Sequence, residues 1–186
     1  MLFHYSVLAL VLLAIGLTLV YTVKTGISPV PTSPRVRDKM LAMIPPERLA
    51  ALERGRLFDL GSGWGTLAFA LAKRFPEAQV TGYELSPLPW AVSRMLNLLL
   101  RRPNLWLRRA DFMGAPLNDA ALVLCYLYPG GMTRLQPKLA AELPPGALVI
   151  SNTFAMPDWQ PADIARADDL YNSPVYLYVA PGPGEA

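Results

Sequence analysis

Phe58-Asp59-Leu60-Gly61-Ser62-Gly63-Trp64-Gly65-Thr66 is the stretch of sequence that decides the fold. Its three alternate glycines come directly after a short apolar run, residues 56–60, and directly before a helical pattern, residues 66–75. Glycine tolerates positive φ and has no Cβ, so a glycine-rich turn lets the backbone approach a ligand closely. A strand, a glycine turn and a helix in this order are typical of the first unit of a Rossmann-like sheet.

Strand and helix patterns continue to alternate after this turn. Expected strands cover residues 56–60, 79–84, 105–109, 121–126 and 147–151, and expected helices cover residues 66–75, 87–100 and 132–143. Two further extended segments, residues 162–167 and 175–180, flank a turn-rich stretch and predict a C-terminal hairpin. The sequence therefore predicts an α/β fold, with a mostly parallel Rossmann-like seven-stranded sheet, a C-terminal antiparallel hairpin and flanking helices.

Acidic residues accompany the glycine turn in a pattern that indicates a particular cofactor. Glu84 closes the second strand about 19 residues after Gly65, the distance at which a carboxylate accepts hydrogen bonds from ribose hydroxyls. Asp59 precedes the first glycine, where a carboxylate suits a cationic ligand with an amino group and repels a pyrophosphate. The glycines have the spacing G-x-G-x-G, whereas dinucleotide sites have G-x-G-x-x-G. These features favour S-adenosylmethionine over a dinucleotide, with the candidate binding residues Asp59, Gly61, Ser62, Gly63, Gly65 and Glu84.

The segment Leu57 to Gly65, with Tyr83-Glu84 at the end of the next strand, resembles the class I, seven-stranded, S-adenosylmethionine-dependent methyltransferases. The resemblance covers the chain from about Arg56 to its C-terminus. It implies that Asp111, in Ala110-Asp111-Phe112, faces the amino group of adenine.

A narrower resemblance rests on motifs elsewhere in the chain. An apolar N-terminal segment is followed by Val30-Pro31-Thr32-Ser33, and later come Gly82-Tyr83-Glu84-Leu85-Ser86-Pro87, Glu142-Leu143-Pro144-Pro145-Gly146-Ala147 and Phe154-Ala155-Met156-Pro157-Asp158-Trp159. Together they are similar to the membrane-anchored family that contains the lysine N-methyltransferase of the ATP synthase c subunit. The resemblance implies methylation of lysine on small membrane proteins. The chain departs from many family members at Trp64, where they carry an acidic residue.

The N-terminal segment predicts a membrane anchor. Residues 5–23 carry no charge, and about 20 apolar residues suffice to cross a bilayer as a helix. Basic residues follow this segment and none precedes it, which by the positive-inside rule places the rest of the chain on the cytoplasmic, inner side. We therefore expect a single-pass membrane protein with the bilayer as a partner. The expected division is a transmembrane anchor at residues 1–25, a linker with N-terminal helices at 26–55, and an S-adenosylmethionine-binding methyltransferase domain at 56–186.

The methyl acceptor should bind after the fourth strand, near Tyr126 and Tyr128. These rings are the candidate catalytic residues of an acceptor pocket, because aromatic faces attract an alkylammonium group, although both can equally serve as packing aromatics. The segment does not contain the Asn/Asp-Pro-Pro-Tyr motif of nucleobase and amide methyltransferases. With one histidine, one cysteine and a net charge of +3, the sequence predicts neither a metal site nor a nucleic-acid partner.

The predicted function is methylation of a protein lysine, on a small membrane protein, by a membrane-anchored enzyme that uses S-adenosylmethionine. Two alternatives remain open on the residues alone. One is a methyltransferase for a lipid, a quinone or another small molecule, and the other is a non-catalytic assembly factor that binds the cofactor.

Overall fold

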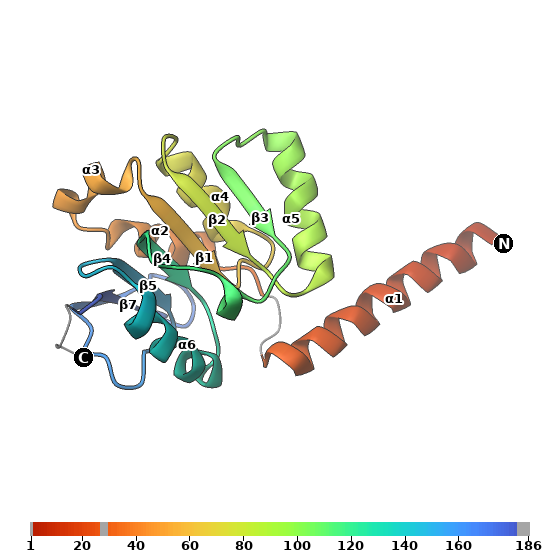
Figure 1. Cartoon of the computed structure of the whole chain (residues 1–186). Coiled ribbons are helices and arrows are strands. Elements are labelled where there is room, and N and C mark those ends of the chain that lie inside the picture. Colours follow the sequence, from red (N-terminus) through yellow and green to blue (C-terminus); the bar gives the residue numbers. More distant parts are fainter. Residues whose placement is uncertain (1, 27–29, 182–186) are drawn as a thin grey trace.

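A computed structural model describes residues 2–26 and 30–181 of the chain (Figure 1). Its centre is one seven-stranded sheet with the spatial order β3-β2-β1-β4-β5-β7-β6. The strands are β1 Arg56–Leu60, β2 Gln79–Tyr83, β3 Leu105–Arg108, β4 Ala120–Cys125, β5 Leu148–Asn152, β6 Asp163–Arg166 and β7 Pro174–Val179. The predicted seven-stranded, Rossmann-like sheet is therefore present. Within it, β7 pairs antiparallel with both β5 and β6, so β7 is the strand that runs against its neighbours.

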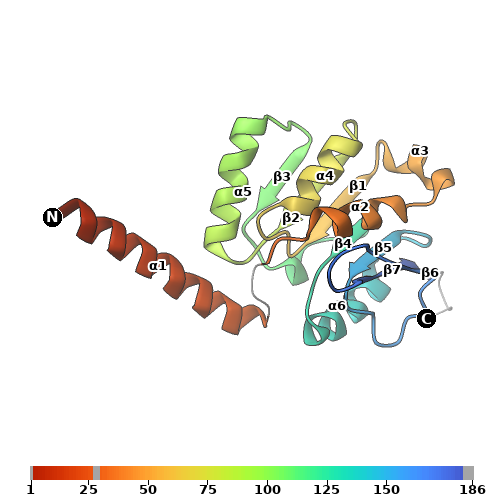
Figure 2. The same cartoon turned by 180° about the vertical axis from the view of Figure 1, so that it is seen from behind.

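Helices cover both faces of this sheet (Figures 1 and 2). The helical elements of the described residues are α1 Leu2–Thr25, which lies apart from the sheet, α2 Pro34–Ala42, η1 Pro46–Arg48, α3 Leu49–Leu52, α4 Thr66–Arg74, α5 Pro87–Leu100, η2 Phe112–Gly114 and α6 Pro129–Glu142. Helix α4 ends where the sequence disfavours its continuation. Pro76 follows α4, and the residue before a proline is disfavoured in the helical region.

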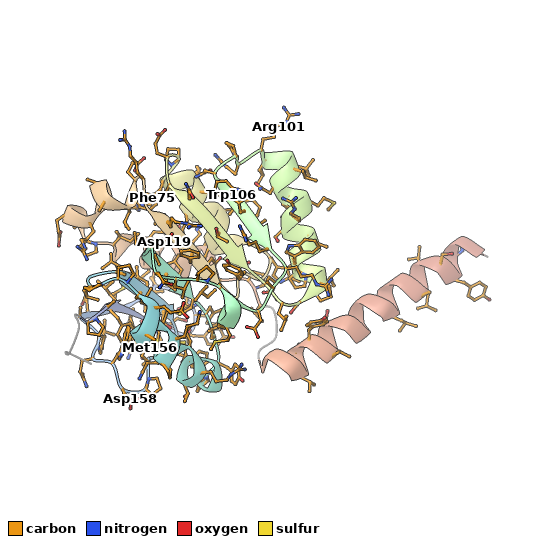
Figure 3. The ribbon with its side chains drawn as sticks, in the orientation of Figure 1. Phe75, Arg101, Trp106, Asp119, Met156 and Asp158 are labelled. Atoms are coloured by element: carbon orange, nitrogen blue, oxygen red, sulfur yellow. The ribbon has the colours of Figure 1, made fainter. Side chains whose placement is uncertain are left out.

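Two apolar cores fill the space between the sheet and these layers. The first packs α2, α3 and α4 against one face, and it contains Phe75. The second packs α6 and residues 115–117 against the other face, and it contains Met156 (Figure 3). On the second face a short 3₁₀ turn, η2, stands between β3 and β4, where the other parallel crossovers carry an α-helix. The loop around η2 is therefore part of the wall that covers the sheet.

The strand order places the predicted site residues along one edge. Chain order reverses between β1 and β4, and ligands of open α/β sheets bind outside the carboxyl ends of the strands at such a switch point. Gly61, Glu84 and Tyr126 each follow directly after a parallel strand, namely β1, β2 and β4. The fold thus gathers at one edge residues that are far apart in the sequence.

The predicted transmembrane anchor is wrong. Within residues 2–26 and 30–181, no helix combines the length and the apolar character that crossing a bilayer requires. The prediction relied on the length, the apolar composition and the absence of charge of residues 5–23, a run that also contains the polar groups of Ser6, Thr18 and Tyr21. The expected placement as a single-pass membrane protein with its domain on the inner side is overturned by the same finding. Helix α1 projects away from the sheet in both views (Figures 1 and 2).

Candidate functional site

A pocket opens at the carboxyl edge of the sheet, beside the switch point. About 1080 Å³ of space lies between its walls, with open solvent at the mouth included. Eight of the nine predicted site residues line it, namely Asp59, Gly61, Ser62, Gly63, Glu84, Asp111, Tyr126 and Tyr128. The ninth, Gly65, does not line the pocket and instead caps the N-terminus of α4.

The glycine turn has the backbone conformation that its sequence requires. Gly61, Gly63 and Gly65 all lie in the left-handed region, with φ of 81°, 51° and 87°. The N–H groups of Gly61 and Ser62 both donate to the Tyr83 carbonyl, at 3.0 and 2.8 Å. An added Cβ at Gly63 would meet no atom within 4 Å, so this glycine borders open space. The turn therefore presents bare backbone to the pocket.

Glu84 fixes this turn relative to β2. Its Oε2 accepts a hydrogen bond from the Gly63 N–H at 2.8 Å, and its Oε1 accepts one from the Ser86 N–H at 2.6 Å. Each carboxylate oxygen can accept more than one hydrogen bond, so both keep acceptor capacity that faces the pocket. Glu84 is thus placed to hold the turn and to accept hydroxyl groups of a ribose.

Asp59 is buried below the turn, with a relative exposure of 1%. Its Oδ2 accepts a hydrogen bond from the Ala68 N–H in the first turn of α4, at 2.9 Å. Burial raises the pKa of Asp59 to about 7; the Ala68 hydrogen bond opposes this rise and the charge of Glu84 adds to it. A cationic group in the pocket would favour the ionised form of this carboxyl group.

Asp111 also lines the pocket. Its side chain caps η2, because Oδ1 accepts a hydrogen bond from the Met113 N–H at 2.9 Å. The neighbouring Phe112 and Met113 line the pocket with it, so a carboxylate and two apolar side chains occupy one wall. This combination suits a flat, apolar base that carries an amino group.

One buried polar atom supports the fit of a ligand. Ser62 is 7% exposed, and its Oγ has no hydrogen-bond partner in the described part of the chain, although it borders the pocket. A buried hydroxyl without a partner costs free energy unless a ligand or water satisfies it. Together with the glycine backbone and two carboxylates, this hydroxyl fits a nucleoside-bearing ligand such as S-adenosylmethionine.

Two aromatic rings also line the pocket, those of Tyr126 and Tyr128. Tyr126 stacks on Phe154, with ring centroids 6.3 Å apart and an interplanar angle of 12°. The Tyr128 ring packs so closely on Gly130 that a Cβ there would lie 2.6 Å from Cε2. Neighbouring packing therefore orients both rings, as a binding surface for a cation requires.

Several lining residues were not predicted as site residues. Residues 30–32 were assigned to a linker, yet Val30, Pro31 and Thr32 line the pocket, and so does Arg134 of α6. Trp159, which ends one motif of the family resemblance, does not line the pocket and packs near Tyr178 with ring centroids 6.3 Å apart. The sequence carried one signal for residues 30–32, because Val30-Pro31-Thr32-Ser33 was one of the motifs of the family resemblance.

Metal and thiol chemistry have no evident site in the described residues. Among residues 2–26 and 30–181, no group of three or more His, Cys, Asp or Glu side chains could hold a metal ion. Burial raises the pKa of the Cys125 thiol to about 12, which keeps it protonated at neutral pH.

The fold and the pocket define the class of this protein as an S-adenosylmethionine-dependent methyltransferase of the Rossmann-like type. The chain belongs to the family described as the ANTKMT methyltransferase domain, whose family model matches residues 59–163. This match covers more than half of the chain. It confirms the predicted methyltransferase class and cofactor.

Two curated relatives are lysine methyltransferases. The chain is 35% identical over 130 residues to the adenine nucleotide translocase lysine N-methyltransferase of Mus musculus, covering 63% of this chain and 53% of that protein. It is 29% identical over 154 residues to a protein-lysine N-methyltransferase of Saccharolobus islandicus, covering 81% of this chain and 91% of that protein. The chain thus spans about half the length of the mouse relative and most of the other. Both agree with the resemblance to a lysine methyltransferase family.

A solved structure supports the cofactor. An RNA methyltransferase from Salinibacter ruber, in complex with S-adenosyl-L-homocysteine, superposes with a TM-score of 0.72 and 30% sequence identity. The superposition covers 84% of this chain and 98% of that one.

Replacing Glu84 should weaken cofactor binding. In Glu84→Gln one acceptor oxygen becomes a donor, so it opposes a backbone N–H and no longer accepts a ribose hydroxyl. We expect the Kd for S-adenosylhomocysteine to rise by at least about tenfold, because a lost hydrogen bond to a charged group is worth roughly 1.5–3 kcal/mol. Calorimetric titration measures this, with the exposed Glu77→Gln as control. An unchanged Kd in Glu84→Gln would contradict the assigned role.

The buried Asp59 should give stability a dependence on pH. The folded chain keeps the Asp59 proton between about pH 4 and pH 7, where the unfolded chain has lost it, so stability falls as pH rises through this window. We expect the unfolding free energy of the wild type to fall relative to Asp59→Asn across this window, by no more than roughly 1–2 kcal/mol per pH unit, and to level off above it. Urea unfolding at several pH values measures this. A difference that stays constant with pH would contradict the assignment.

Proposed function

We propose that this protein transfers a methyl group from S-adenosylmethionine to the side-chain amine of a lysine in another protein. The observation that carries this proposal is the pocket itself. It is lined by the glycine turn, Glu84 and Asp111 and also by the oriented rings of Tyr126 and Tyr128. The glycine turn and the two carboxylates suit a nucleoside, and the aromatic rings suit an alkylammonium side chain. The two curated lysine methyltransferase relatives support the same acceptor chemistry.

The reaction breaks one bond of the methyl carbon and forms another. When bound, S-adenosylmethionine supplies an activated methyl group on a sulfonium. The lysine nitrogen forms a bond to the methyl carbon, the carbon–sulfur bond breaks, and its electron pair stays on sulfur in S-adenosylhomocysteine. Because an ammonium nitrogen has no lone pair, the lysine side chain must lose one proton to solvent before this bond forms. The protein's part is to align nucleophile and methyl group, because alignment alone can supply a large share of the rate enhancement.

Different residues of the pocket bind the cofactor and the lysine side chain. Glu84 and the glycine turn hold the nucleoside, and Asp59 places a carboxyl group beneath the amino-acid part of the cofactor. Tyr126 and Tyr128 guide the lysine side chain, since a cation over an aromatic face gains roughly 0.5–2 kcal/mol. Val30, Pro31 and Thr32 line the same pocket ahead of α2 and help to close it.

The first candidate acceptor is a small membrane protein, because the sequence resembles a family that methylates such proteins. The mouse relative is named for the adenine nucleotide translocase, which favours a protein acceptor. A structural relative is named as an RNA methyltransferase, so RNA belongs in the test as a competing acceptor. Lipids and quinones belong there as well.

Labelled S-adenosylmethionine should therefore transfer its methyl group to protein. The full chain is incubated with membrane extracts, and label is counted separately in protein, lipid and RNA fractions. We expect label in protein, with mass spectrometry placing it on lysine. Label confined to lipid or RNA would refute a lysine acceptor. Cofactor binding without any transfer would instead support a non-catalytic binding protein.

Changes at Tyr126 should act on the acceptor and not on the cofactor. Tyr126→Leu removes the aromatic face, whereas Tyr126→Phe keeps both the face and the stacking on Phe154. We expect the leucine variant to raise KM for the protein acceptor by about three- to thirtyfold, and the phenylalanine variant to stay near the wild type. KM for S-adenosylmethionine should change little in either. Equal effects of the two substitutions would exclude a cation–π role.

A further inference from the structure

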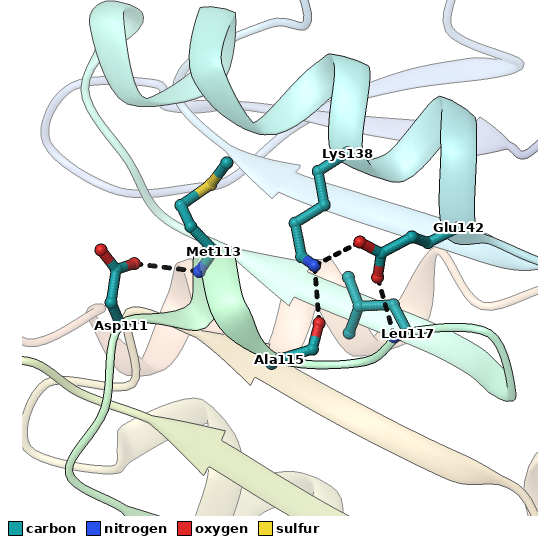
Figure 4. A network of polar contacts seen from close by, with 6 residues as sticks. All are labelled: Asp111, Met113, Ala115, Leu117, Lys138 and Glu142. Atoms are coloured by element: carbon teal, nitrogen blue, oxygen red, sulfur yellow. Dashed lines mark hydrogen bonds and ion pairs between the residues drawn. The ribbon is translucent and has the colours of Figure 1, made fainter.

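A lysine–glutamate pair with a buried lysine and a half-buried glutamate lies outside the pocket, on α6 (Figure 4). The Lys138 side chain is only 5% exposed, and that of Glu142 is 30% exposed. Lys138 Nζ lies 2.6 Å from Glu142 Oε1 and donates a second hydrogen bond, also 2.6 Å, to the Ala115 carbonyl. Glu142 Oε2 accepts a hydrogen bond from the Leu117 N–H at 3.1 Å. Two neighbouring side chains of one helix thus hold two peptide groups of one loop.

The loop they hold carries one wall of the pocket. Asp111, Phe112 and Met113 line the pocket, and only a few residues separate them from Ala115 and Leu117. The segment is also bonded within itself, since the Ala115 N–H donates to the Phe112 carbonyl at 3.0 Å. A shift at Ala115 is therefore passed on through η2 to the Asp111 carboxylate.

Helix α6 contributes to the pocket directly as well. Gly131 and Arg134 line it, and Arg134 lies one helical turn before Lys138. The same helix therefore lines the pocket near its N-terminus and binds the loop nearer its C-terminus. This arrangement fixes the distance between the two walls.

Stability alone does not account for a buried pair at this place. Ala115, Leu117 and Leu139 are buried in the same apolar core, so apolar contacts already attach the loop to α6. Replacing a buried ion pair by apolar side chains of similar volume is often neutral or stabilising. Apolar packing has no preferred direction, whereas hydrogen bonds to a carbonyl and an N–H fix the position of both peptide groups. The pair therefore fixes the position of Ala115 and Leu117 relative to α6.

We propose that Lys138 and Glu142 are positioning residues for cofactor binding, which hold the loop of residues 111–117 so that Asp111 meets the adenine base. The pair touches neither cofactor nor acceptor and acts through Asp111. This inference rests on the role proposed for Asp111 in binding the adenine amino group. It adds a determinant of cofactor selectivity that lies outside the pocket wall.

The test replaces both members of the pair, so that no unpaired charge stays buried. In Lys138→Met/Glu142→Met the core keeps apolar side chains of similar length, and folding is checked by thermal melting. We expect the double variant to melt within a few degrees of the wild type, whereas its Kd for S-adenosylhomocysteine rises by at least about tenfold. Calorimetry on the full chain measures binding without any acceptor.

Helix α6 offers a matched control. Gln136 makes two hydrogen bonds to Asp158, at 2.9 and 3.0 Å, and so attaches a different loop to the same helix. Neither residue lines the pocket. Gln136→Met should leave the Kd within about twofold of the wild type. If it weakens binding as much as the double variant does, the effect is general loosening of α6 and the proposal is refuted.

Base selectivity separates positioning from a merely structural role. S-inosylhomocysteine differs from S-adenosylhomocysteine in having a carbonyl in place of the adenine amino group. The wild type should prefer the adenosyl compound, and the double variant should lose most of this preference. An unchanged preference, or an unchanged Kd, refutes the proposal while leaving the methyltransferase assignment intact. A wild type that binds neither compound refutes both.

Discussion

The attachment of the β1–α4 turn to the end of β2 is the constraint on which the rest of the site depends. The Tyr83 carbonyl accepts two N–H groups of the turn, and Glu84 accepts a third from Gly63. In this arrangement Gly61 and Gly63 have left-handed backbone, which residues other than glycine rarely adopt. With the turn fixed in this way, bare backbone, a buried hydroxyl and a carboxylate face the same space at the switch point of the sheet.

Two buried polar groups of this site lower the stability of the chain without a ligand. Asp59 is almost fully buried with a raised pKa, and the Ser62 hydroxyl has no partner within the described residues. Both features weaken the chain on its own, and both are relieved by a cationic ligand with hydrogen-bonding groups. The pocket wall that carries Asp111 is formed by a loop, because η2 is too short to pack against the sheet as an α-helix. There, Lys138 and Glu142 of α6 support the loop.

Local patterns predicted the sheet well because its strands are short, apolar and separated by glycine and proline. β4 is an uninterrupted apolar run, and α5 begins at Pro87 as expected. The same approach failed at the N-terminus, where absence of charge was taken to predict a membrane anchor that the described residues do not support. It also assigned Val30 to Thr32 to a linker, since nothing local reveals that a segment packs against a distant pocket.

The sequence by itself determined the class of fold and the cofactor, because the glycine turn and its acidic partners are constrained by local backbone geometry and by fixed spacing. Only the tertiary structure decided which other residues share the pocket. Val30, Met113 and Arg134 come from three separate parts of the chain, and only the folded chain brings them together at one pocket. It likewise decided that Lys138 is buried, because burial depends on the loop that packs over α6 and not on the helix's own sequence.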